Sequence, residues 1–139
     1  MRPLVVDANV WVSAADPTDT RSASSRMFLQ SVIRLRQRVI IPALAQLEVA
    51  CALSRRWRSA AKELSLARRL HRSKLITQLD LDPLLADALE LGTGSLLRAA
   101  DSLYLAAAHS TAGLLISWDK ELIQRAGALT PEDWLAAAR

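Results

Sequence analysis

The segment from Leu97 to Asp119 constrains the fold more strongly than any other part of the sequence. It begins as an apolar helical run with Asp101 in its first turn, and residues 111–113 favour a turn. Residues 114–116 then form a short apolar run, which Asp119 follows closely. Such a run between turn signals is typical of a buried strand in a parallel sheet, although periodicity alone does not exclude a helix. The segment therefore predicts a helix, a turn, a buried strand and a carboxylate, in that order.

Short apolar runs elsewhere in the chain alternate with helical patterns. Strands are predicted at 4–6, 38–42, 75–79 and 113–116, with a further edge strand at 126–129. Helices are predicted to begin near Ala8, Ser22, Ala43, Arg58, Asp82, Leu97, Lys120 and Pro131, and residues 92–95 are predicted to form a loop. This alternation predicts an α/β fold, in which a parallel central sheet is flanked by helices as an α/β/α sandwich. The 139 residues suit a single domain, 1–139.

Four acidic residues are predicted to gather at one edge of this sheet. Asp7 and Asp119 follow strands, and Glu48 and Asp101 lie early in helices that start from the same edge. Open α/β sheets bind their ligands at the carboxyl ends of the strands. A site of several carboxylates without Cys or His suits Mg²⁺ or Mn²⁺, and such ions can activate water and stabilise an in-line displacement at phosphorus. The predicted reaction is hydrolysis of a phosphodiester.

Two of these acids also have simple structural interpretations, which the sequence leaves open. Asp7 could cap the helix that follows it, because Asp is a favoured N-cap residue. Asp101 could cap its helix or form a weak pair with Arg98 at i,i+3 spacing.

Glu48 interrupts an apolar helical stripe that includes Leu44 and Cys51. A carboxylate in such a place is costly unless a partner compensates its charge. The partner could be a buried arginine such as Arg55 or Arg58, but we favour a metal ion because other acids are available to share it. Cys51 is predicted to lie in the core rather than to act as a nucleophile.

The charge of the chain is unevenly distributed. The net charge is +4, yet residues 1–74 hold 14 Lys and Arg against 5 Asp and Glu, whereas residues 75–139 hold 4 against 9. A basic face attracts phosphate or an acidic partner, although arginine-rich helices are also common as solvated surface. The residues that we predict to contact RNA or a partner are Arg55, Arg56, Arg58, Lys62, Arg68, Arg69 and Arg72.

The sequence also bears on the cellular location. Its single cysteine excludes an internal disulfide framework, and no segment has the order of regions found in a secretory signal. Charged residues interrupt every apolar run before it reaches the roughly 18 to 20 residues that span a bilayer. We therefore expect a cytoplasmic protein without a membrane contact.

Four segments resemble, in order and spacing, the acidic motifs of PIN-domain ribonucleases, especially the VapC-type toxins of VapBC toxin–antitoxin pairs. They are LVVDANVW, PALAQLEVACAL, LRAADSLYLAAA and LLISWDKEL, and together they extend over nearly the whole chain. By this resemblance the metal-binding catalytic acids would be Asp7, Glu48, Asp101 and Asp119, with Asn9 and Ser117 as supporting polar residues. Ser117 stands where a threonine is common and keeps the hydroxyl group.

The resemblance implies a PIN fold that cleaves RNA with Mg²⁺ or Mn²⁺, forms a homodimer, and is neutralised by a small antitoxin whose tail enters the site. Two other functions remain open, a catalytically silent PIN-like scaffold and a metal-dependent phosphoryl hydrolase. A haloacid dehalogenase-type enzyme would need a second Asp in place of Asn9, and a receiver domain would need adjacent acids after its first strand and a late lysine. Neither pattern is present.

Overall fold

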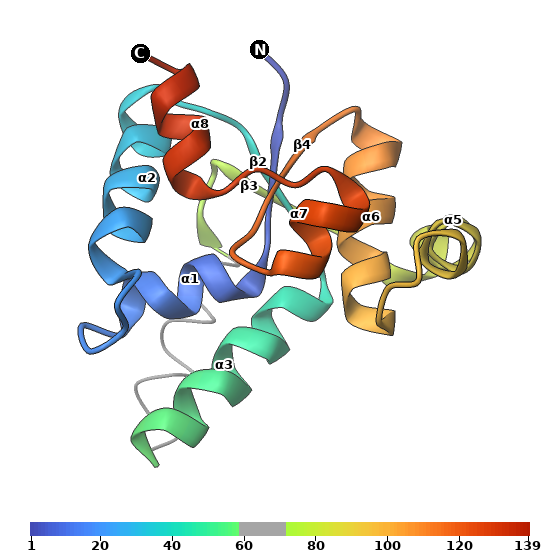
Figure 1. Cartoon of the computed structure of the whole chain (residues 1–139), viewed down its shortest axis with the longest axis horizontal. Helices are drawn as coiled ribbons and strands as arrows, with labels where there is room; N and C mark the ends of the chain where they lie inside the picture. Colours follow the sequence, from blue (N-terminus) through green and yellow to red (C-terminus); the bar gives the residue numbers. More distant parts are fainter. Residues whose placement is uncertain (59–71) are drawn as a thin grey trace.

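The computed structural model describes residues 1–58 and 72–139, and a parallel sheet forms its centre (Figure 1). The strands are β1 (Leu4–Val6), β2 (Val39–Pro42), β3 (Ile76–Leu79) and β4 (Leu114–Ile116). They are hydrogen-bonded in the order β3-β2-β1-β4, and every pair is parallel. The predicted α/β fold with a parallel central sheet is therefore confirmed.

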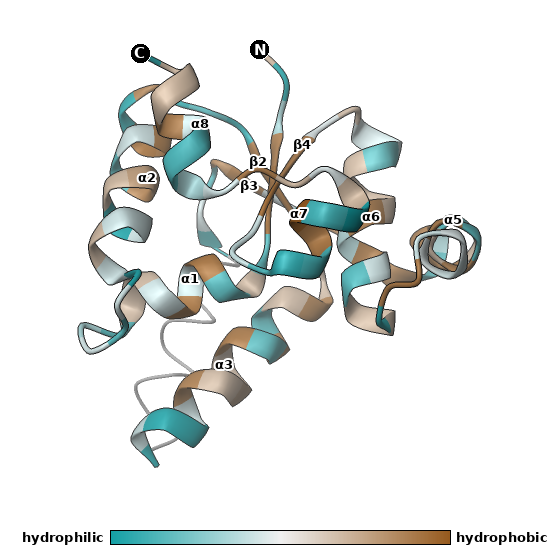
Figure 2. Cartoon of the chain, in the orientation of Figure 1, coloured by the Kyte–Doolittle hydropathy of each residue, from teal (hydrophilic) through white to brown (hydrophobic). Residues whose placement is uncertain are grey.

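The burial of the strands explains their sequences. Every residue of β1 and β2 is buried, whereas β3 at the sheet edge is only partly buried. Strands that are covered on both faces are apolar throughout, and this explains why β1 and β2 lack alternation. Figure 2 shows β1 and β4 among the most hydrophobic parts of the ribbon, while the helices mix apolar and polar residues.

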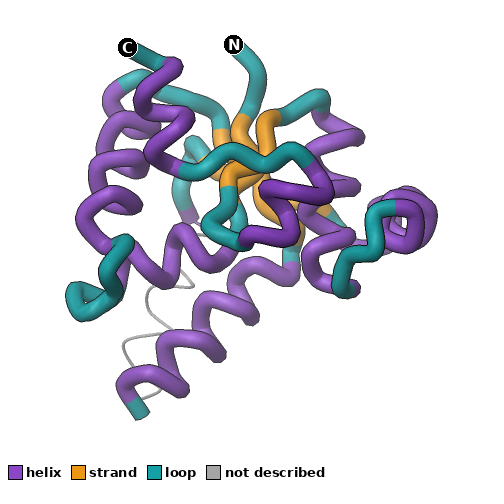
Figure 3. The backbone as a smooth tube through the Cα atoms, in the orientation of Figure 1, coloured by secondary structure: helices purple, strands orange, loops and turns teal. Residues whose placement is uncertain are grey.

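Helices surround the sheet, as the tube in Figure 3 makes clear. They are α1 (Ala8–Ala15), α2 (Ser22–Arg34), α3 (Leu44–Trp57), α5 (Leu81–Gly94), α6 (Ala99–Thr111), α7 (Lys120–Ala126) and α8 (Pro131–Ala137). Helix α6 packs on β1, β2 and β4, and α5 packs on α6. On the other side of the sheet α2 packs on α1 and α8, where the rings of Phe28 and Trp134 meet edge to face with centroids 5.2 Å apart (Figure 1).

The last part of the chain differs from the expectation of an edge strand at 126–129. Helix α7 continues to Ala126 and ends at Gly127, whose φ of 68° lies in the left-handed region that favours glycine. Leu129 forms one isolated parallel bridge with Ile116. Thr130 already caps α8 through a capping box with Asp133, and Gly127 is left-handed, so only Ala128 and Leu129 can be extended between the two helices.

The loop predicted at 92–95 is wrong, because α5 continues as a helix to Gly94. Gly92 is buried where α5 meets α6, and a Cβ atom at this position would lie 2.0 Å from Ser102 Oγ. Gly92 thus serves close helix packing and does not mark a chain reversal.

A helix predicted to begin at Arg58 and run to Lys74 falls mostly on residues 59–71, which lie outside the described part of the chain. Arg58 itself is the C-cap of α3, with φ at 49°. Within the described residues, no helix combines the length and the apolar character that crossing a membrane requires.

The close packing at Gly92 leads to a stability prediction. Gly92→Ala should lower the free energy of unfolding by about 1 to 3 kcal/mol, because the new methyl group overlaps Ser102. Urea unfolding followed by circular dichroism measures the effect. Gly94→Ala is the matched control, since no atom lies within 4 Å of a Cβ built there. Equal stability of the Gly92→Ala variant and the wild type would contradict the packing argument.

Candidate active site

A pocket of about 560 Å³ opens at the carboxyl ends of the strands. The chain adds β2 and β3 on one side of β1 and then places β4 on the other side, so the strand order reverses between β1 and β4. Crevices for ligands form at such reversal points in open α/β sheets. The pocket is lined by Asp7, Ala8, Asn9, Val12, Leu44, Leu47, Glu48, Cys51, Ala52, Arg55, Arg56, Arg98, Asp101 and Asp119.

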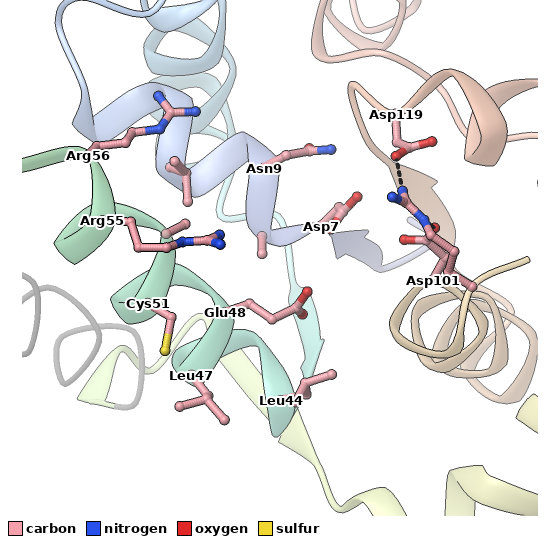
Figure 4. Close-up of a pocket in the computed structure, with 14 residues that line it drawn as sticks. Asp7, Asn9, Leu44, Leu47, Glu48, Cys51, Arg55, Arg56, Asp101 and Asp119 are labelled. Atoms are coloured by element: carbon pink, nitrogen blue, oxygen red, sulfur yellow. Dashed lines mark hydrogen bonds and ion pairs between the residues drawn. The ribbon is translucent and has the colours of Figure 1, made fainter.

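The structure brings all four predicted acids to this pocket (Figure 4). Asp7 follows β1, Asp119 follows the end of β4, and Glu48 and Asp101 come from α3 and α6. Their side chains enter the same space from four different elements. They are close enough for their charges to interact, because the charges of Glu48 and Asp101 both raise the pKa of Asp7.

Asp7 is held by Ser117, which in turn contacts Asn9; the PIN resemblance singled out both polar residues. Ser117 Oγ donates a hydrogen bond of 2.6 Å to Asp7 Oδ2. The same Oγ accepts one from Asn9 Nδ2 at 3.1 Å and one from the Asp119 backbone N–H at 2.9 Å. One donated and two accepted bonds use the whole hydrogen-bonding capacity of a hydroxyl group. Ser117 therefore links Asp7, Asn9 and the backbone of Asp119.

The loop that carries Asp119 is anchored at two further points. The Trp118 backbone N–H donates to Asn9 Oδ1, and its indole Nε1–H donates to Ser25 Oγ in α2. Trp118 is buried, and Arg21 lies over its ring at 5.2 Å from the centroid. Helices α1 and α2 thus hold the loop on which Asp119 is presented.

Asp7 is buried, and its environment disfavours the charged form. Burial, followed by the charges of Glu48 and Asp101, raises the pKa of Asp7 to about 7, although the hydrogen bond from Ser117 acts in the opposite direction. Asp7 occupies the N-cap position of α1, but its side chain makes no capping hydrogen bond. The alternative that Asp7 serves as a helix cap is therefore wrong.

Glu48 has a neutral partner that the sequence analysis did not identify. Tyr104 Oη donates a hydrogen bond of 2.8 Å to Glu48 Oε1. Burial, together with the charges of Glu48 and Asp7, raises the pKa of this tyrosine, so it remains a donor. Burial also raises the pKa of Glu48, and the charge of Asp101 adds to this effect. Among the described residues Glu48 forms no ion pair, so the alternative of a pair with Arg55 or Arg58 finds no support.

Asp101 and Asp119 share one arginine. Arg98 Nε donates to Asp101 Oδ2 at 3.1 Å, and its Nη2 donates to Asp119 Oδ2 at 2.7 Å, the contact dashed in Figure 4. The i,i+3 pair of Asp101 with Arg98 is thus present. Burial raises the pKa of Asp101, and the contact with Arg98 partly offsets this effect. Asp119 also caps α7, because its Oδ1 accepts from the N–H groups of Glu121 and Leu122.

The arrangement of carboxylates suits a divalent metal ion. Oxygens of Asp101, Asp119 and Glu121 all lie within 4.8 Å of one another. Such an all-oxygen donor set is the kind that Mg²⁺ and Mn²⁺ prefer. Glu121 was not among the predicted site residues. The sequence signal for it was weak, because an acid in the first turn of a helix is commonly explained by the helix dipole alone.

The wall of the pocket opposite Asp101 and Asp119 is one face of α3. Leu44, Leu47 and Cys51 lie along this face, and Leu47 is 60% exposed (Figure 4). The core face of α3 is formed instead by Ala45, Val49 and Leu53. The prediction that Cys51 lies in the core is therefore wrong, since its thiol is exposed and faces the pocket.

Two of the predicted basic residues, Arg55 and Arg56, line the pocket, and they differ in their ion pairs. Arg56 pairs with Asp16 and Asp19 at 2.8 and 3.0 Å, so its charge is compensated. Arg55 forms no ion pair with a described residue, and its guanidinium group points into the pocket (Figure 4). Arg58 and Arg72 are exposed and do not line the pocket. Lys62, Arg68 and Arg69 lie outside the described residues.

A family comparison agrees with this geometry. The sequence model of the PIN domain matches residues 4–128, which include all four acids. The chain belongs to the PIN-domain family. Among proteins with curated descriptions, none matches this PIN domain.

Solved structures with the same fold include a toxin and a toxin–antitoxin complex. VapC20 from Mycobacterium tuberculosis, a toxin that cleaves the sarcin-ricin loop, has a TM-score of 0.71 and 16% identity, with 91% of this chain and 96% of that chain covered. A toxin–antitoxin complex from Klebsiella pneumoniae has a TM-score of 0.67 and 15% identity, with 92% and 97% covered. FitAcB from Neisseria gonorrhoeae has a TM-score of 0.69 and 20% identity, with 94% and 98% covered. At these identities the likeness establishes the fold of the PIN domain.

The raised pKa of Asp7 predicts how stability depends on pH. The unfolded carboxyl group ionises near its ordinary pKa of 3.8, whereas the folded one retains its proton up to about pH 7. Ionisation of Asp7 therefore destabilises the metal-free fold as pH rises from 4 to 7, by at most about 4 kcal/mol. Asp7→Asn removes this penalty and should raise the melting temperature at pH 8 by several degrees, with a smaller effect at pH 5. Thermal unfolding in the presence of a chelator measures both values.

Asp16→Asn is the control, because it should change the melting temperature in the opposite direction. The pKa of Asp16 is lowered, first by its hydrogen bond from Thr18 and then by that from Arg56. Its ionised form thus adds stability above the ordinary pKa, and this contribution disappears as pH falls. Asp16→Asn should therefore lower the melting temperature at pH 8. If Asp7→Asn lowered it as well, the argument from burial would be wrong.

Proposed function

We propose that this PIN domain is a Mg²⁺- or Mn²⁺-dependent endoribonuclease and the toxin of a VapBC-type toxin–antitoxin pair. The proposal rests on the convergence of Asp7, Glu48, Asp101 and Asp119 on one pocket. Family membership and the fold shared with VapC20, a toxin that cleaves an RNA loop, support it.

The metal site that we propose combines two sets of oxygens. Asp101, Asp119 and Glu121 would hold the ion, with Asp7 offering a further oxygen and Glu48 binding the water of the ion. A bound divalent ion supplies a more acidic water molecule and charge stabilisation for the phosphate group. Burial is the largest cause that raises the pKa values of Asp7, Glu48 and Asp101, and such shifts are common where carboxylates gather at a functional site.

Glu48 is the residue that we propose as proton acceptor. Its Oε1 is occupied by Tyr104, whereas no described residue donates to Oε2. Oε2 can therefore accept a proton from an attacking water, and the raised pKa of Glu48 moves it towards the range useful at neutral pH. The water oxygen bonds to phosphorus as the bond from phosphorus to the 3′ oxygen breaks, and the departing 3′ oxygen takes up a proton from solvent. The products are a 3′-hydroxyl and a 5′-phosphate.

The wall formed by α3 suits a single-stranded RNA. The exposed side chain of Leu47 and the neighbouring Leu44 offer an apolar surface for an unstacked base. Arg55 lies on the same wall without a described ion-pair partner and can bind a phosphate group. We assign the weaker, sequence-independent contacts to the exposed Arg58 and Arg72.

A small antitoxin is the protein partner that we propose, and a homodimer is the proposed assembly. The relative from Klebsiella pneumoniae is itself a toxin–antitoxin complex, and it covers nearly the same length of chain. The homodimer rests on the resemblance to VapC-type toxins. An antitoxin that ends in the acidic pocket would need a cationic group, because the pocket gathers several carboxylates.

The proposal predicts metal-dependent RNA cleavage that requires Asp101. The purified protein should cut a mixed cellular RNA pool with Mg²⁺ or Mn²⁺ and lose this activity in chelator. Asp101→Asn should lower the rate by a factor on the order of 100 or more, since even changes outside the ligand shell of a metal cost about 10- to 100-fold. Asp87→Asn is the matched control, because Asp87 is exposed on α5 and does not line the pocket. Cleavage that persists in chelator, or in Asp101→Asn, would overturn the proposal.

A further inference from the structure

Arg98 contacts every residue of the carboxylate cluster that suits a metal ion. The cluster consists of Asp101, Asp119 and Glu121. Arg98 donates to Asp101 and Asp119 at 3.1 and 2.7 Å, and its Nε lies 3.9 Å from Glu121 Oε2. One guanidinium group therefore occupies the place where the three carboxylates meet.

The contact with Asp119 uses the oxygen that a metal ion would need. Asp119 Oδ1 already accepts from two backbone N–H groups at the start of α7. Oδ2 is the remaining oxygen, and Arg98 Nη2 donates to it. A divalent cation at Oδ2 would stand beside the positive guanidinium group, and like charges at such distances repel strongly. Arg98 and the metal ion are therefore alternatives at this oxygen.

Arg98 can leave this position without disturbing the core. Its side chain is 67% exposed, whereas those of Asp101 and Asp119 are 11% and 22% exposed. The arginine thus approaches the two less exposed carboxylates from the solvent side. Among the described residues its side chain donates only to these two acids, so a rotation of the side chain breaks no other hydrogen bond.

We propose that Arg98 is a displaceable counter-cation, which competes with the divalent ion for Asp101 and Asp119 and so sets the ion concentration at which the site is loaded. This inference rests on the metal dependence in the proposed function. In the metal-free state Arg98 offsets the repulsion between the two carboxylates. When the ion binds, the guanidinium group moves to the rim of the pocket, where it can meet a phosphate of the RNA.

Calorimetric titration with Mn²⁺ and Mg²⁺ tests the competition without reference to activity. Arg98→Gln should bind Mn²⁺ about three- to tenfold more tightly than the wild type, because no ion pairs have to be broken first. Arg56→Gln is the matched control. Arg56 lines the same pocket but pairs with Asp16 and Asp19, which lie outside the carboxylate cluster, so its loss removes one positive charge and leaves the competitor in place. Equal or weaker binding by Arg98→Gln, or the same gain in Arg56→Gln, would overturn the inference.

A second measurement uses the unaltered protein. In a ¹H–¹⁵N spectrum, Mg²⁺ should shift the Arg98 Nε–H resonance towards that of a solvated arginine, with Arg56, which pairs outside the cluster, much less affected. An Arg98 resonance that stays unchanged while Mg²⁺ binds would refute displacement.

The competition at Arg98 and the proposed nuclease function can be contradicted separately. Tighter ion binding by Arg98→Gln without RNA cleavage supports the competition and contradicts the nuclease, whereas no ion binding by either protein contradicts both.

Discussion

The hydrogen bond from Ser117 Oγ to Asp7 Oδ2 joins the carboxyl ends of two neighbouring strands, and the pocket depends on it. β1 and β4 are adjacent, so the residues that follow them must share a narrow space at the sheet edge. A buried carboxylate in that space needs a donor, and a hydroxyl group also leaves two lone pairs for Asn9 and for the backbone of Asp119. A single side chain thus positions one acid directly and a second through its backbone.

Bringing the acids of this PIN domain together destabilises their charged forms, and other groups in the site partly offset this effect. Desolvation and mutual repulsion raise the pKa values of Asp7, Glu48 and Asp101. Three kinds of group act against this destabilisation, namely a hydroxyl at Asp7, a phenol at Glu48 and a guanidinium at Asp101 and Asp119. The first two are buried and the third is exposed. The site therefore combines two buried neutral donors, Ser117 and Tyr104, with one exposed cation, Arg98, that can move away.

The role of α3 shows why helical periodicity alone can mislead. Leu44 and Cys51 suggested a core face that Glu48 interrupts, but these residues line the pocket together with Glu48. The helix buries Ala45, Val49 and Leu53 instead. Both sets have helical spacing, and a sequence does not show which of two apolar stripes faces the interior. Gly92 was ambiguous in a similar way. Its glycine suggested a loop, but in the structure it allows α5 to pack closely on α6.

The parallel sheet and the convergence of Asp7, Glu48, Asp101 and Asp119 followed from the sequence by itself. Strands that end in acids, and helices that start from the same edge of the sheet, place their acids together. Apart from the i,i+3 pair of Arg98 with Asp101, the tertiary structure decided which groups compensate their charges. Tyr104 meets Glu48 across 56 positions of the chain, and Arg98 meets Asp119 across 21. Such pairs arise where elements pack, and local spacing carries no information about them. The same holds for Glu121, which joins the carboxylate cluster because α7 starts beside α6 at this edge of the sheet.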